Sequence, residues 1–86
     1  MKIRKNIAIS ENGFLFNPVS GESFSVNPIG VEIITLLKED KAIGEISEIL
    51  QQKFNSDKET IEKDISDFLS LLTSYSLAED DGTKNN

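Results

Sequence analysis

Acidic side chains are the residues of this sequence that come closest to a chemical motif, because 15 of its 86 residues are Asp or Glu and none is His or Cys. Two adjacent pairs, Glu39-Asp40 and Asp80-Asp81, bring carboxylates together. Neither pair has the ligand spacing of a calcium loop, and hydrolysis by paired carboxylates needs a cleft that the sequence does not suggest. The lack of His and Cys also removes the usual proton shuttle and any thiolate nucleophile or ligand. We therefore expect a binding protein without cofactor or metal, and not an enzyme.

The net charge of the chain limits its partners. At −6, the chain would repel the phosphates that nucleic-acid-binding proteins neutralise with Lys and Arg, so neither nucleic acid nor an anionic membrane is expected as a partner. Residues 1–9 are the exception, since Lys2, Arg4 and Lys5 form a basic edge without an acid. That edge could meet an acidic peptide or a partner enzyme, although lysines on a first strand also protect a sheet edge from aggregation.

The length of the chain fits one domain with a hydrophobic core of modest size. A chain this short buries only about 60 to 65% of its unfolded surface, so we expect a surface groove rather than an enclosed cavity. No apolar run has the length of a signal peptide or a membrane span. The sequence therefore predicts a soluble, cytoplasmic protein.

Three short strands are predicted before residue 27. In residues 2–9 the isoleucines fall on the odd positions 3, 7 and 9, with Lys5 interrupting, which is typical of a half-buried strand. Asn12-Gly13 predicts a tight hairpin turn with positive φ at both central positions, and residues 14–16 form the returning strand. A turn with Pro and Gly at residues 17–21 leads to a third strand at residues 22–26.

Three helices are predicted after the strands. Asn27-Pro28 predicts a capped helix start, and the charged residues 38–41 end this helix. A second helix is expected at residues 42–54, with a poorly capped start. The third has the clearest start, since Ser56 and Glu59 have the spacing of a capping box, and it continues to Tyr75. In this helix Leu71 and Tyr75 widen one flank of a central apolar stripe made by Ile61, Ile65, Phe68 and Leu72.

These elements predict an α+β fold of winged-helix-like type, with a three-stranded antiparallel sheet followed by a three-helix bundle. Residues 1–78 form this domain, and Leu77 packs back onto it. Residues 79–86 are polar and lack aliphatic side chains, so we expect a disordered tail.

Two segments carry a resemblance to a known family. Residues 17–22, Asn-Pro-Val-Ser-Gly-Glu, are followed by residues 26–30, Val-Asn-Pro-Ile-Gly, and an apolar helix. This order resembles the strand, turn, strand and Leu-Asn-Pro-Thr-Gly signature of the PqqD family, the RiPP recognition elements, with Ile29 in place of the usual Thr. Residues 46–54 and 61–69 resemble the family's second and third helices, so the resemblance covers roughly residues 3 to 79.

The resemblance implies binding of the leader segment of a ribosomally made precursor peptide. Family members hold the leader as an added strand beside the third strand, in the groove against the third helix, and hand it to a radical SAM or other modifying enzyme. Strand addition uses the free backbone groups of an edge strand. The residues expected to bind the peptide are Ser23, Phe24, Ser25, Val26, Ile61, Asp64, Ile65, Phe68, Leu71 and Tyr75.

Other interpretations fit the same residues. Phe24 and Val26 are also typical of ordinary core, Leu71 and Tyr75 of a helix that packs on two neighbours, and Asp64 of a solvated surface charge. A winged-helix DNA-binding regulator has the same order of elements, but the third helix carries more acids than lysines and no arginine. A homodimerisation domain, joined through the wide apolar arc of the third helix, also stays open, as does a monomer.

Overall fold

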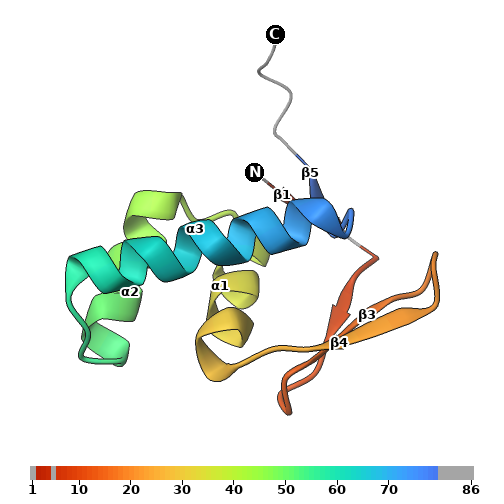
Figure 1. Cartoon of the computed structure of the whole chain (residues 1–86), viewed down its shortest axis with the longest axis horizontal. Helices are drawn as coiled ribbons and strands as arrows, with labels where there is room; N and C mark the ends of the chain where they lie inside the picture. The colour runs from red at the N-terminus through yellow and green to blue at the C-terminus, as the bar shows by residue number, and fades with distance from the viewer. Residues whose placement is uncertain (1, 5, 80–86) are drawn as a thin grey trace, which may run out of the picture.

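The computed structural model describes residues 2–4 and 6–79, and it contains the predicted order of three antiparallel strands followed by three helices (Figure 1). The three-stranded sheet has the order β2-β3-β4, so β3 is its central strand. Three helices follow it along the chain. The elements are β2 (Ala8–Ile9), β3 (Phe14–Asn17), β4 (Glu22–Ser25), α1 (Pro28–Lys38), α2 (Ile43–Lys53) and α3 (Lys58–Ser74).

The predicted first strand is wrong as one continuous element. It divides into β1 (Lys2–Ile3) and β2, because the chain turns between them, where the Ile7 N–H donates to the Arg4 carbonyl at 3.1 Å. β1 pairs instead with β5 (Ala78–Glu79) in a second, antiparallel sheet. Glu79, which we grouped with the tail, thus belongs to a strand, and the rest of the predicted tail lies outside the described residues.

The first hairpin turn differs in type from the prediction. Gly13 has a φ of 89°, but Asn12 is not in the positive-φ region. The Gly13 N–H donates to the Ser10 carbonyl at 3.1 Å and the Ser10 N–H to the Phe14 carbonyl at 2.9 Å, so three residues form the loop and only the last is left-handed. A Cβ on Gly13 would lie 2.6 Å from the Val26 carbonyl oxygen, which requires glycine at this position.

The helix starts confirm one predicted cap and correct another. The Asn27 side chain accepts from the Gly30 N–H at 2.8 Å, as expected for α1. α3 is capped by Asp57 and not by Ser56, because the Asp57 carboxylate accepts from the Thr60 N–H at 3.3 Å. Donation from the Thr60 hydroxyl, at 2.8 Å, and from the Thr60 N–H lowers the pKa of the Asp57 carboxyl.

All three helices end in the same motif. The residue after each C-cap is left-handed, with φ of 62° at Asp40, 50° at Asn55 and 59° at Ser76. The next N–H then donates to the carbonyl five residues earlier, as from Leu77 to Leu72 at 2.8 Å. This is the Schellman arrangement, which satisfies carbonyls at the helix end.

The core lies between the helices and one face of the sheet. In α3, Ile61, Ile65 and Leu72 are buried, which confirms the predicted stripe, and Leu77 is buried as expected. The sheet contributes Leu15, which is fully buried on β3. No helix of the described residues is long and apolar enough to cross a membrane.

Candidate functional site

The free edge of β4 is the first part of the candidate site. β4 pairs only with β3 in the three-stranded sheet. The Val26 N–H donates to the Gly13 carbonyl at 2.7 Å, on the β3 side. In an antiparallel ladder alternate residues point their N–H and C=O groups to the same neighbour, so Phe24 also points to β3. Ser23 and Ser25 therefore direct their backbone donors and acceptors away from the sheet, toward the free edge.

A cavity of about 320 Å³ lies between this edge and α3. From α3 it is lined by Phe68, Leu71 and Tyr75. The rings of Phe24 and Tyr75 are 4.7 Å apart between centroids and tilted by 50°, a favourable aromatic geometry that ties the strand to the end of the helix. The remaining lining residues are Phe24, Ser25, Val26 and Asn27.

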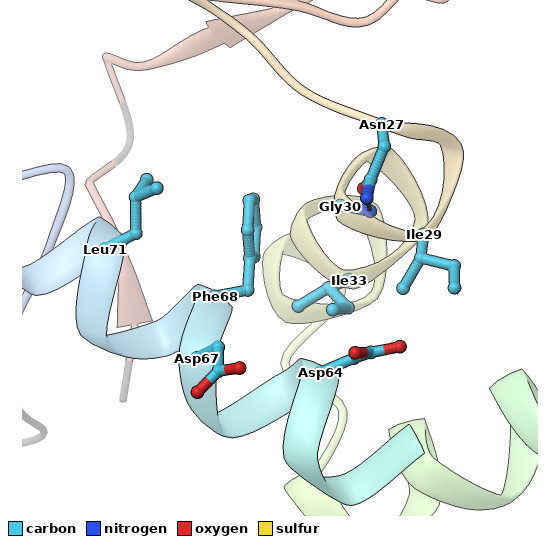
Figure 2. Close-up of a pocket in the computed structure, with 8 residues that line it drawn as sticks. All are labelled: Asn27, Ile29, Gly30, Ile33, Asp64, Asp67, Phe68 and Leu71. Atoms are coloured by element: carbon cyan, nitrogen blue, oxygen red, sulfur yellow. Dashed lines mark hydrogen bonds between the residues drawn. The ribbon is translucent and has the colours of Figure 1, made fainter. Parts of the chain in front are cut away.

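A second cavity of about 230 Å³ continues from the first, since Asn27, Phe68 and Leu71 line both. Figure 2 shows the Phe68 ring rising from α3 toward the start of α1. The other residues that line the second cavity are Ile29, Gly30, Ile33, Asp64 and Asp67. We name the two cavities together the β4–α3 groove.

Gly30 sets the position of Phe68 at the middle of the β4–α3 groove. A Cβ on Gly30 would lie 3.0 Å from the Phe68 Cε1 atom and 3.1 Å from the Asn27 Oδ1 atom. Such distances are tighter than ordinary contacts. The missing side chain of Gly30 therefore lets the Phe68 ring pack against the capped first turn of α1.

Two carboxylates stand at the α1 end of the β4–α3 groove, and they differ in their partners. Asp67 pairs with Lys63 at 3.0 Å between Oδ2 and Nζ, and this hydrogen bond and charge raise the pKa of Lys63. Asp64 is partly buried and makes no salt bridge within the described part of the chain, although its charge also helps to raise the pKa of Lys63. Asp64 is thus the carboxylate of the groove that is available to a cation.

Most of the predicted site residues come together in the groove. Those that line it are Phe24, Ser25, Val26, Asp64, Phe68, Leu71 and Tyr75. Leu71 and Tyr75 are 39% and 47% exposed, as expected of a groove wall. Ser23 does not line the groove, but its backbone belongs to the free edge of β4.

Ile61 and Ile65 do not line the groove. Their exposed fractions are 0% and 2%, because they occupy the part of the apolar arc that faces the bundle, and Ile65 borders a separate cavity with Ile43 and Leu69. The sequence analysis also missed five lining residues. Three of them, Asn27, Ile29 and Gly30, belong to the Asn-Pro-Ile-Gly segment at the start of α1, which was the available signal. The other two are Ile33, in the middle of α1, and Asp67, in α3.

The basic edge has a structural contact. The Arg4 Nε–H donates to the Ser76 carbonyl at 2.8 Å, which ties β1 to the end of α3. Lys5 lies outside the described residues. No cluster of three or more His, Cys, Asp or Glu side chains suited to a metal ion occurs in the described ranges.

Comparisons with known proteins identify a family and two similar solved structures. The family model described as "Coenzyme PQQ synthesis protein D (PqqD)" matches residues 12–78, which confirms the predicted resemblance. The solved structure "TbiB1 in Complex with the TbiA(beta) Leader Peptide" is 28% identical, with a TM-score of 0.81 and coverage of 99% of this chain and 100% of that chain. The structure "Lasso peptide synthetase B1 complexed with the leader peptide" is 20% identical, with a TM-score of 0.79 and coverage of 92% and 96%. No curated protein matched the chain.

Proposed function

This chain belongs to the PqqD family, and from that premise we propose that it binds the leader segment of a ribosomally synthesised precursor peptide. The observation that carries the proposal is the free edge of β4 beside the β4–α3 groove. The similarity to TbiB1, whose solved structure is a complex with a leader peptide, supports it over nearly the full length of both chains.

The peptide would add to the sheet as a fourth strand. Ser23 and Ser25 offer one N–H and one C=O each to its backbone. The peptide residue opposite Phe24 would then point toward Phe68, Leu71 and Tyr75, and its burial would contribute affinity. Backbone bonds thus account for strand addition, while the groove side chains account for sequence preference.

Asp64 would receive a basic side chain of the leader. The apolar walls of Ile29, Ile33 and Phe68 suit the aliphatic stem of a Lys or Arg, whose charged end could then reach the carboxylate. Asp67 is less suited, since Lys63 already neutralises it.

The protein would present the bound leader to a modifying enzyme, a radical SAM protein or another maturase, and would not itself catalyse the modification. The sequence has no His or Cys to act as proton shuttle or thiolate. A domain that binds the leader and leaves the core of the precursor free is suited to such a presenting role.

The test is a titration of the nitrogen-15-labelled protein with synthetic leader peptides encoded near its own gene, with the TbiA(beta) leader as a further probe. We expect saturable amide shifts at Ser23 and Ser25 and along the Phe68 to Tyr75 face of α3. Duplex DNA of random sequence is the control, and the acidic α3 predicts no shifts with it.

Two results would reject the proposal. Shifts with DNA and none with any leader would favour a winged-helix regulator. A dimer that forms without peptide and buries Leu71 and Tyr75, seen as concentration-dependent sedimentation, would favour a dimerisation domain.

A further inference from the structure

The outer face of the three-stranded sheet carries two exposed aromatic side chains. Phe14 is 55% exposed and Phe16 is 43% exposed, although both lie in a regular strand between buried residues. Phe14 lies opposite Ser25, and Phe16 lies between Ser23 and Ala8. Because these cross-strand neighbours are small, they leave the two rings uncovered, and an exposed apolar patch of this kind is typical of a binding surface.

The patch is continuous with the free edge of β4. Directly opposite residues of paired antiparallel strands share a face of the sheet. Ser23 and Ser25 therefore place their side chains on the outer face while their backbone groups point to the edge. A strand added there has the residues opposite Ser23 and Ser25 on the outer face, in the same rows as Phe16 and Phe14.

The distances in such a sheet permit contact across the serines. Neighbouring strands lie about 4.8 Å apart, so β3 and an added strand are roughly 10 Å apart. A phenyl ring from one side and a large apolar side chain from the other can meet over a serine, which fills little of that width. A shallow trough thus runs over Ser23 and Ser25, with Phe16 and Phe14 as one wall.

We propose that the leader peptide supplies the other wall, with large apolar side chains at two alternate positions, i and i+2, that pack on Phe14 and Phe16. This inference rests on the proposed function and extends it. The leader is then recognised on both faces of the sheet. Its residue at i+1 enters the β4–α3 groove, and the residues at i and i+2 cover Phe14 and Phe16 on the outer face.

The test compares leader affinity in a double variant that removes both rings and in a control that changes an exposed apolar side chain away from the patch. In the double variant Phe14→Thr, Phe16→Thr, threonine preserves strand propensity while both rings are lost. The control is Val19→Thr, because Val19 is 82% exposed but lies in the β3–β4 turn, outside the rows. Affinity is measured by calorimetry with the synthetic leader peptide encoded beside this gene, and the amides of Ser23 and Ser25 report whether it still binds at the edge.

We expect the double variant to bind at least about 10-fold more weakly and Val19→Thr to stay within about two-fold. Should the double variant fail to fold, the reciprocal experiment uses the wild-type protein and a leader with Ala at i and i+2, and the same loss is expected. If the double variant folds, it is also titrated with the alanine-substituted leader. The two losses of affinity should then not add, since the protein change and the leader change remove the same contacts.

Unchanged affinity in the double variant, with the Ser23 and Ser25 amides still shifted, would overturn the inference and leave the proposed function intact. Unchanged leader affinity with lost binding to the modifying enzyme would also overturn it, and would assign the outer face to that enzyme. If no leader shifts these amides even in the wild type, the proposed function fails and the inference fails with it.

Discussion

A proline at Ser25 tests the orientation of the β4 backbone. The Val26 N–H donates to Gly13 at 2.7 Å, so the Ser25 N–H points away from β3 and takes no part in that ladder. Ser25→Pro removes this backbone donor and no other, together with the Ser25 hydroxyl. Edge strands tolerate proline where the N–H faces away from the sheet, and the preceding Phe24 already has the extended backbone that proline requires. We therefore expect little change in the free energy of unfolding.

Leader affinity should fall, because one carbonyl of the added strand loses its donor. Leaving such a group unpaired costs about 1 to 3 kcal/mol, which corresponds to a Kd raised roughly 5- to 150-fold. Ser25→Ala is the matched control, since it removes the hydroxyl and keeps the N–H, and its Kd should stay close to that of the wild type. Phe24→Pro is the opposite control: it removes an N–H that points to β3 and should destabilise the fold.

The assays are calorimetry with the leader peptide and urea unfolding of each variant. If Ser25→Pro folds and binds the leader as tightly as the wild type, the β4 edge does not carry the peptide. If instead Ser25→Pro is destabilised as much as Phe24→Pro, the alternation of backbone groups along β4 has been assigned wrongly.

Three further outcomes are expected. Ser76→Gly relieves a left-handed φ of 59° and keeps the backbone carbonyl that Arg4 binds, so urea unfolding should show a gain of about 0.5 to 1 kcal/mol; a loss would contradict this. Asp57→Ala should lower the melting temperature. Because hydrogen bonds from Thr60 lower the pKa of Asp57 in the folded protein, the stabilisation by this carboxylate is present above the ordinary Asp pKa and is lost as the pH falls through the lowered, folded-state pKa. The melting curves of the wild type and of Asp57→Ala should therefore converge in acid. Asp64→Asn should weaken binding of a Lys- or Arg-containing leader roughly two- to five-fold at low salt, and salt-independent loss would exclude an ionic contact.

Local signals in the sequence predicted the helices well. Asn27-Pro28 holds both the capping oxygen and the fixed φ that start α1, so no distant contact is needed to place that boundary. The start of α3 was harder, since Ser56 and Asp57 are both capping residues. The structure assigns the cap to Asp57, whose carboxylate accepts from the Thr60 N–H.

Long-range pairing could not be predicted from the alternation of isoleucines. Ile3 faces Ala78 at the other end of the chain, and nothing in residues 2–9 indicates that partner. A period of two shows that a segment is extended and half buried, but not which strand lies beside it. For the same reason, the three apolar residues 14–16 did not indicate that Phe14 and Phe16 face outward while Leu15 faces the core.

Only part of the candidate site was predicted. A helical projection identifies the apolar arc of a helix but not the residues that pack against it. Ile61 and Phe68 belong to one stripe by spacing, yet Ile61 is fully buried and Phe68 lines the groove. The difference arises from what lies opposite each residue. Phe68 meets the bare first turn of α1 at Gly30, and a projection of α3 alone contains no information on that contact.

The departure of Ile29 from the family's usual Thr is consistent with this arrangement. The capping bond of α1 comes from Asn27, so a hydroxyl at position 29 is not needed to start the helix. Ile29 is instead partly buried and lines the α1 end of the β4–α3 groove together with Asp64. That end is thereby apolar on its sides and anionic at Asp64, whereas the Tyr75 end is aromatic and without a carboxylate among its lining residues. A peptide with one basic and one aromatic anchor would fit the groove in only one direction, so the chemical difference between its ends can fix the polarity of the bound strand.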